Sequence, residues 1–324
     1  MLKLKASQSE PLAAQVQTVK HSSLSILLAR IKKDKYLLLL CLPGLVYFLI
    51  FKYLPMWGVL LAFKNYQPFI GFFGSEWVGL DNFRQFFQDP VFFRLVRNTL
   101  LLGLYDMVFF FPAPIILALL LNEIRKSFYK RLIQSLIYVP HFISMVIVAS
   151  ISYLLLTTEG GAINEMIYGL TGQKMEFLTS EKWFRPLIIT QSLWKEMGWG
   201  TIIFLAALAG VDQEQYEAAI VDGANRFRQV WHITLPAIRG TIIVLLILRM
   251  GNFLDRGFEQ VLLMSNALNR PVAEVFDTYV YTLGITQGAF SYSTAVGLFK
   301  AIIGIILVFT SNYLAKRAGH SGIF

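Results

Sequence analysis

Six long apolar runs dominate this chain and constrain its fold more than any other feature. Each run is close to the ~20 residues that an α-helix needs to cross a lipid bilayer. Only 15% of the residues are charged, whereas soluble domains carry about 25%. Pro112 and Pro114 predict a kink in the second run, and Pro140 predicts one in the third. We therefore predict an all-α, polytopic helical membrane protein with six transmembrane helices, at residues 36–62, 99–121, 132–156, 184–209, 237–264 and 294–314.

Lysine and arginine residues are distributed unequally between the segments that flank these runs. Sixteen lie before Tyr36, in or beside the second and fourth connections, or after Leu314, whereas eight lie in the alternate connections. Basic residues favour the cytoplasmic side of a membrane. We therefore predict a multi-pass protein with both termini in the cytoplasm. The same rule accounts for the net charge of +9, so we expect the lipid bilayer, and not nucleic acid, as the partner of the basic residues.

The sequence divides into a cytoplasmic tail (1–35), a transmembrane domain (36–317) and a C-terminal tail (318–324). Four apolar residues of the first tail recur at helical spacing beside basic residues, which predicts a short amphipathic helix on the inner leaflet. A helix that binds a protein partner is the alternative. The four residues are Leu24, Leu27, Leu28 and Ile31.

No sequence pattern indicates catalysis, nucleotide binding or metal binding. The chain has no Gly-x-x-x-x-Gly-Lys-Ser/Thr loop for phosphates, and its four histidines are dispersed. His141 and Ser144 lie one turn apart, but no positioned acid accompanies them. The single cysteine, Cys41, excludes an intrachain disulfide. We therefore predict no catalytic residue, no metal site and no cofactor bound by this chain.

The connection at residues 210–240 predicts a helix-turn-helix. Asp212 can cap a first helix, with Gln215 as the partner three residues later. Gly223 can adopt the backbone conformation that ends this helix. A second short helix is expected at residues 226–234.

Small side chains are concentrated in this connection and allow another protein surface to approach its backbone closely. Phe227 and Trp231 lie one turn apart and are expected to give the second helix an apolar anchor. An ordinary loop between two spans is the alternative interpretation. The small residues are Ala218, Ala219, Gly223 and Ala224.

The spacing within this connection is similar to a known motif. Glu217-Ala218-Ala219, then Asp222-Gly223-Ala224 and Leu235-Pro236, resemble the EAA loop of bacterial ABC importer permeases. Gly240 departs from that family, which often has proline there. The resemblance extends over residues 36–317. A resemblance to the maltose-type, binding-protein-dependent carbohydrate class is carried by residues 77–83 and 98–100. A resemblance to its oligosaccharide branch, which includes the alginate importer, is carried by residues 257–260, 277–281, 297–300 and 312–317.

This resemblance implies the type I ABC importer permease fold in the bacterial inner membrane, with the loop as a cytoplasmic coupling helix. It also implies a heterodimer with a second permease subunit, two copies of an ATPase subunit that bind ATP and Mg²⁺, and an external or periplasmic substrate-binding protein. The implied substrate is an oligosaccharide, with the acidic polysaccharide alginate as the specific candidate. The residues implied in ATPase coupling are Glu217, Ala218, Ala219, Asp222, Gly223, Ala224, Leu235 and Pro236.

Several ionisable residues lie inside the apolar runs, where each costs about 2.5–3.5 kcal/mol at mid-membrane and tends to face a cavity or a partner. In the fifth run, four polar residues recur on one predicted helical face with Asp255 beside them. We interpret these residues as a translocation path, with internal ion pairs as the alternative. Asp106 and Lys300 are expected to be structural partners. The residues of the predicted path are Lys195, Arg249, Asn252, Asp255, Arg256 and Glu259.

Other functions are compatible with parts of the pattern. The chain could be a permease for another oligosaccharide or glycoside. A membrane-embedded glycosyltransferase would need clustered catalytic groups at one membrane surface, and none stands out. A stand-alone secondary carrier would be expected to show internal duplication, which the sequence does not display.

Overall fold

A computed structural model describes residues 32–255, 257–317 and 319. These residues are mostly helical, which confirms the predicted all-α fold class. The chain divides into two units, residues 1–58 and 59–324, which are described in turn. The amphipathic helix predicted at residues 24–31 and the path residue Arg256 lie outside the described residues.

Residues 35–58 of the first unit belong to one apolar helix. This helix begins with α2 (Lys35–Phe48) and continues through the π-helical segment η1 (Leu49–Tyr53). The 3-10 segment η2 (Leu54–Phe63) completes it, so that the helix covers the predicted first span. None of its most apolar window is buried, as expected for a helix that lipid surrounds.

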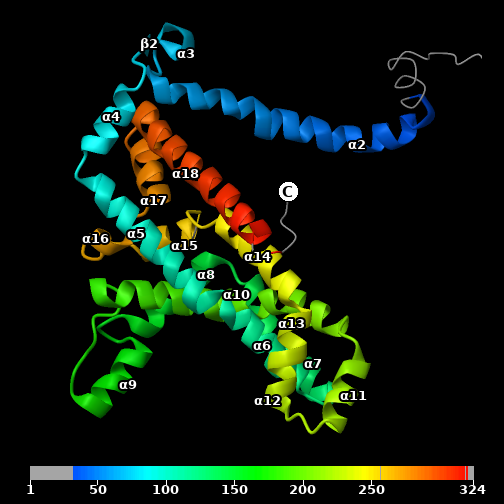
Figure 1. Cartoon of the computed structure of the whole chain (residues 1–324). Helices are drawn as coiled ribbons and strands as arrows, with labels where there is room; N and C mark the ends of the chain where they lie inside the picture. The colour runs from blue at the N-terminus through cyan, green and yellow to red at the C-terminus, as the bar shows by residue number, and fades with distance from the viewer. Residues whose placement is uncertain (1–31, 256, 318, 320–324) are drawn as a thin grey trace, which may run out of the picture. The chain divides into compact units, whose positions relative to one another are not determined.

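The second unit starts with the last residues of η2, which a short strand pair and then further helices follow (Figure 1). β1 (Lys64–Asn65) pairs antiparallel with β2 (Glu76–Trp77), and α3 (Gly71–Gly74) lies between them. The later elements are α4 (Asp81–Gln88), α5 (Val91–Tyr105), η3 (Asp106–Phe110), α6 (Pro112–Asn122), α7 (Ser127–Tyr138), η4 (Val139–Phe142), α8 (Met145–Leu156), α9 (Ala162–Thr171), α10 (Glu181–Ala209), α11 (Gln213–Val221), α12 (Arg226–Gln229), η5 (Val230–Thr234), α13 (Leu235–Ala237), α14 (Arg239–Gly251), α15 (Phe258–Met264), α16 (Arg270–Ala273), α17 (Phe276–Tyr281), η6 (Thr282–Thr286) and α18 (Phe290–Arg317).

Three helices in the described part of the chain are long and apolar enough to cross a membrane, namely Lys35–Phe63, Val91–Asn122 and Phe290–Arg317. Two bent helix pairs raise the number to five if each pair is one span. The predicted fourth span corresponds to α10, a helix of 29 residues. Lys195 and Glu196 are adjacent in α10 and lower its hydropathy, and it is not among those five.

The third predicted span is bent, as the position of Pro140 predicts, whereas the second continues through Pro112 and Pro114 as one helix, Val91–Asn122. Ser127–Phe142 and Met145–Leu156 meet at an angle of 98°. Pro140 lies in the 3-10 segment η4, just before the bend. Proline lacks an N–H and its ring clashes with the preceding turn of a helix, so a regular helix does not continue there.

The predicted continuous helix at residues 237–264 is wrong. Its beginning is bent by 62° between α13 and α14, and α14 ends at Gly251. A non-helical segment follows, and α15 starts only at Phe258. Gly257 precedes α15 with a φ of +67°, a conformation that L-residues with a Cβ resist. Residues on the two sides of this break therefore do not share one helical face.

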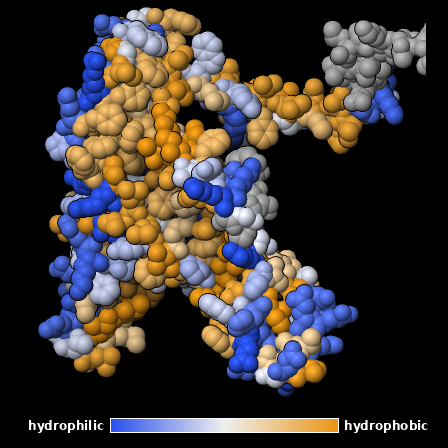
Figure 2. Space-filling view, in the orientation of Figure 1, coloured by the Kyte–Doolittle hydropathy of each residue, from blue (hydrophilic) through white to orange (hydrophobic). Residues whose placement is uncertain are grey.

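Helix α10 connects two of the three hydrophobic clusters found among the described residues of the second unit. Its first part packs on α8 and α15 through Phe184 and Ile188. Its last part packs on α6 and on the start of α14 through Phe204 and Leu208. Figure 2 shows hydrophobic side chains over the middle of this unit, where a lipid-facing surface is expected.

We expect Gly198→Ala to destabilise the protein by about 1–3 kcal/mol, the usual cost of overpacking. A Cβ on Gly198 would lie 2.0 Å from the backbone oxygen of Ile137, so α10 and α7 must move apart. Gly169→Ala in α9 is the matched control, because nothing lies within 4 Å of its added Cβ. Thermal unfolding in detergent measures both variants, and equal midpoints for the two would contradict the close approach of the helices.

Candidate functional site

The connection predicted as a helix-turn-helix is a helical hairpin, residues 212–237. Its first helix, α11, is capped by Asp212, whose carboxylate accepts a hydrogen bond from the backbone N–H of Glu214 at 3.0 Å. Gly223, which has a φ of +76°, lies two residues after the last residue of the helix and prevents it from continuing. The N–H of Ala224 donates to the carbonyl of Ala219 at 2.8 Å, and this bond closes a Schellman motif. The predicted helix start and break are therefore confirmed.

The second arm of the helical hairpin is braced against the first. Asn225 caps α12 by accepting a hydrogen bond from the N–H of Arg228 at 2.9 Å. The buried side chain of Gln229 donates to the carbonyl of Ala224 at 2.8 Å. The hydroxyl groups of Tyr216 and Thr234 lie 2.9 Å apart and link the two arms. The turn therefore has a defined geometry.

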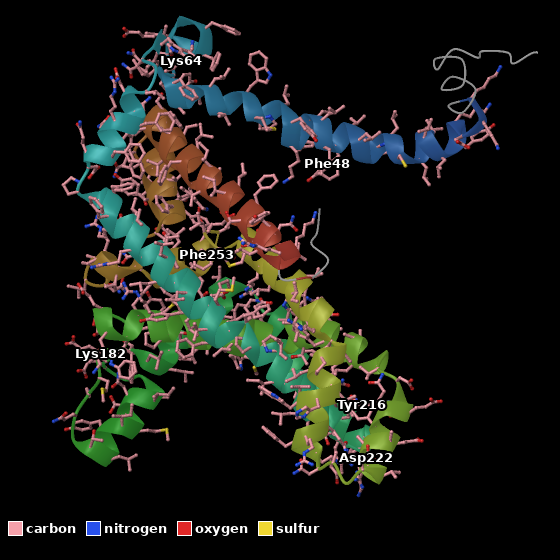
Figure 3. The ribbon with its side chains drawn as sticks, in the orientation of Figure 1. Phe48, Lys64, Lys182, Tyr216, Asp222 and Phe253 are labelled. Carbon is pink, nitrogen blue, oxygen red and sulfur yellow. The ribbon has the colours of Figure 1, made fainter. Side chains whose placement is uncertain are left out.

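The tip of the helical hairpin is exposed and partly apolar. Val221 is 87% exposed, and Ile220 is also exposed. Phe227 and Trp231 stack with their ring centroids 6.4 Å apart, but both are exposed. Among the described residues they therefore do not anchor the second helix, whereas Tyr216 and residues of η5 and α14 join the core cluster at the end of α10. Figure 3 shows Asp222 toward the tip of the hairpin.

The residues that the sequence implicates in coupling lie along this hairpin. Most of them are exposed, namely Glu217, Ala218, Asp222, Gly223 and Pro236. The others are partly buried, namely Ala219, Ala224 and Leu235.

A cavity of about 530 Å³ lies between α5, η3, α8, α10, α14 and α15. Three residues of the predicted path line it, namely Lys195, Arg249 and Glu259. They come from α10, α14 and α15, so the cavity joins elements that are distant in the sequence. The lining also includes Asp106, Ser192, Glu196, Trp199 and Gln260.

Arg249 is paired with Asp106 across the cavity wall. Its Nε donates to Asp106 Oδ2 at 2.8 Å, and its Nη2 donates to Asp106 Oδ1. The guanidinium carbon lies 4.2 Å from the centroid of the Phe110 ring. A bidentate pair with a ring beneath it fixes the direction of the guanidinium group. Asp106 is thus a structural partner, as expected.

A second polar cluster surrounds the bend of the third span. Lys195 Nζ donates to the backbone oxygen of His141 at 2.7 Å and lies 3.2 Å from Glu196. Glu196 Oε2 also lies 2.6 Å from Nδ1 of His141. The imidazole stacks on the indole of Trp199 at 4.4 Å with an interplanar angle of 4°. His141, which follows Pro140, therefore connects the bend to the cavity wall. The sequence did not predict this connection.

The other predicted path residues lie elsewhere. Asn252 lines a neighbouring cavity of about 240 Å³, which it shares with Arg249. Asp255 is paired with Lys300, and Lys300 is also paired with Asp277. The prediction that the polar residues of the fifth span share one helical face is wrong, because α14 ends before Asn252. The alternative interpretation, internal ion pairing, holds for Arg249, which pairs with Asp106, and for Asp255, which pairs with Lys300.

Comparison with known proteins identifies the family. A sequence model described as "binding-protein-dependent transport system inner membrane component" matches residues 92–320. The polygalacturonan/rhamnogalacturonan transport system permease protein YteP of Bacillus subtilis (strain 168) is 55% identical over 321 residues, which are 99% of this chain and 100% of that protein. Protein LplB of the same organism is 66% identical over 297 residues, which are 92% and 93% of the two chains.

A solved structure has the same fold. A chain in the crystal structure of "a bacterial ABC transporter involved in the import of the acidic polysaccharide alginate" is 38% identical and has a TM-score of 0.85, covering 90% of this chain and 99% of that chain. Several relatives are named as permeases, which are channel subunits and not enzymes. The chain therefore belongs to the family of binding-protein-dependent transport system inner membrane components and is an ABC importer permease of the carbohydrate class.

Proposed function

We propose that this permease moves an acidic oligosaccharide through its 530 Å³ cavity and that a separate ATPase docks on the helical hairpin. One observation carries the coupling part of the proposal. The helices that support the hairpin also form the cavity wall. The hairpin packs on the end of α10 and runs directly into α14, while α10 supplies Lys195 and α14 supplies Arg249 to the cavity.

A movement of the hairpin would therefore be transmitted directly to α10 and α14, which line the substrate path. The exposed apolar side chains of Val221 and Phe227 suit burial against a second protein, because apolar surface removed from water favours association. The small residues Ala218 and Gly223 let that protein approach the backbone. In this proposal the ATPase binds ATP and Mg²⁺, and this chain binds neither.

The proposed substrate class is an oligosaccharide that contains uronic acids. YteP is named for polygalacturonan and rhamnogalacturonan, and the solved relative imports alginate. Both names refer to polymers that carry carboxylates. Lys195 and Arg249 have carboxylate partners in the cavity, so we propose that they orient an acidic sugar by hydrogen bonds and not through an excess of positive charge. A neutral oligosaccharide or glycoside is the alternative substrate.

We further propose the remaining parts of the assembly. The permease pairs with a second permease subunit, two ATPase subunits and an extracytoplasmic binding protein, and both of its termini lie in the cytoplasm. A related solved transporter is described "in complex with alginate pentasaccharide-bound periplasmic protein", which supports the binding protein in this proposal.

Stimulation of ATP hydrolysis by different sugars tests the substrate class. The assembled transporter would be reconstituted in lipid and mixed with binding proteins loaded with oligogalacturonate, alginate oligosaccharide or maltodextrin. We expect at least one of the two acidic sugars to stimulate hydrolysis and maltodextrin to leave the basal rate unchanged. Stimulation by maltodextrin alone would overturn the proposed substrate class and leave the coupling proposal standing.

Trp199→Ala is expected to raise the KM for transport by roughly two- to tenfold, equivalent to about 0.5–1.5 kcal/mol of lost aromatic contact. The indole of Trp199 lines the cavity, where a sugar ring can stack. Trp194→Ala is the matched control, because Trp194 lies on the same helix, is equally exposed and lines a different cavity. Uptake kinetics in proteoliposomes measure both, and equal effects of the two changes would argue against a sugar contact at Trp199.

A further inference from the structure

The loop at residues 64–77, here called the aromatic loop, presents apolar side chains that no other described residue covers. Phe69 is fully exposed, Phe73 is 89% exposed, and Ile70 is more than half exposed. No acidic or basic residue occurs from Asn65 to Ser75. The tip is therefore an uncharged apolar surface, although it is part of a connection between helices.

The fold holds these side chains outward. Strands β1 and β2 form the base of the loop. Lys64 lies at this base (Figure 3), and its ammonium donates to the carbonyls of Phe72 at 2.7 Å and Ser75 at 3.2 Å. The hydroxyl of Ser75 donates to the carbonyl of Gly71 at 2.7 Å, and Gly71 has a φ of +77°. The charge at the base is therefore used to close the loop and does not reach its tip.

The base of the aromatic loop is fixed to the ends of two apolar helices. The loop follows directly after Phe63, where the first membrane-spanning helix ends, and Phe63 stacks on Trp77 at 5.8 Å. The N–H of Tyr66 donates to the hydroxyl of Ser291 at 2.8 Å, at the start of α18. Lys35–Phe63 and Phe290–Arg317 are both long and apolar enough to cross a membrane. The loop therefore lies at the level where two spans leave the bilayer.

We propose that the aromatic loop inserts Phe69 and Phe73 into the lipid at this membrane surface, at the boundary between acyl chains and headgroups. Exposed Phe, Trp and Leu side chains of interfacial segments bury at the boundary between headgroups and acyl chains. A protein-binding patch is typically rimmed by polar groups, whereas residues 68–74, which form the tip, carry no polar side chain. In the sequence the loop also follows directly on the first span, whose most apolar window is wholly exposed.

Nitroxide labels test this insertion, because Cys41 is the single cysteine of the chain. In a Cys41→Ala background, Phe69→Cys, Ile70→Cys, Phe73→Cys and Glu76→Cys would each be labelled in the complete transporter in lipid nanodiscs, with reactive cysteines of the other subunits replaced. Collision rates with oxygen, which dissolves in lipid, and with a water-soluble nickel chelate are then compared. We expect oxygen to collide more often than the chelate at positions 69, 70 and 73, and the reverse at position 76, which is exposed at the base of the loop.

Two results would overturn the inference. One is chelate access at positions 69, 70 and 73 that equals the access at position 76. The other is a label at position 73 that becomes immobilised only after the extracytoplasmic binding protein is added, since this would identify a protein-docking surface. Basal ATP hydrolysis equal to that of the Cys41→Ala transporter verifies that each labelled variant is folded.

Discussion

Gly223→Pro is expected to abolish oligosaccharide-stimulated ATP hydrolysis by the assembled transporter, while the permease still inserts into the membrane. Gly223 has a φ of +76°, whereas the proline ring fixes φ at about −65°. Proline also removes the N–H that Gly223 donates to the carbonyl of Ile220 at 3.0 Å. The turn between α11 and α12 must therefore change, and with it the surface proposed to receive the ATPase. Hydrolysis in proteoliposomes, with and without loaded binding protein, measures the loss.

Two control substitutions distinguish the turn from general damage. Gly223→Asn should retain most of the stimulation, because asparagine visits the left-handed region more readily than other residues with a side chain. Gly240→Ala should have little effect, because nothing lies within 4 Å of its added Cβ. Stimulation of the Gly223→Pro transporter at the rate of the unmodified transporter would refute a role of this turn in coupling.

Lys300→Met is expected to destabilise the permease by about 3–5 kcal/mol, the usual cost of removing one partner of a buried ion pair. Lys300 is 8% exposed and is paired with both Asp255 and Asp277. Without its ammonium, the two carboxylates face each other with no cation between them in the described part of the structure. Thermal unfolding of the purified transporter in detergent should show a lower midpoint.

The double variant Lys300→Met with Asp277→Asn is the informative control. It removes one of the two carboxylates together with the cation, so it should recover part of the lost stability even though it carries more changes. Lys300→Arg keeps the charge and should be milder than Lys300→Met. If Lys300→Met unfolds at the midpoint of the unmodified protein, the ion pairs do not stabilise the junction of Asp255, α17 and α18.

The helical hairpin could be predicted in detail because its signals are local. Asp212 caps the helix that follows it, Gly223 ends that helix, and both effects act within a few residues of the side chain concerned. Pro140 likewise predicted the bend of the third span. The family motif added the proposed partner, which no local signal in the sequence specifies.

The fifth span and the ion pairs could not be predicted because they depend on contacts between distant segments. Helical spacing places Arg249 and Glu259 on one face only if the helix is continuous from one to the other. The helix is interrupted between Gly251 and Phe258, and no proline in this segment signals the interruption. Asp106 lies 143 residues from Arg249 in the sequence, and the periodicity of either helix carries no information about the other. His141 was considered only with Ser144, whereas its partner in the structure is Glu196.

The helical hairpin is proposed to receive a separate ATPase at the cytoplasmic surface. Site-directed photo-crosslinking in intact membranes tests this docking most directly, with a photoreactive amino acid in place of Val221, the most exposed large apolar residue of the tip, and with Phe73 as the comparison position. We expect position 221 to capture the ATPase subunit and position 73 not to capture it. Capture of the extracytoplasmic binding protein at position 221, or no capture of the ATPase there in an active transporter, would contradict it.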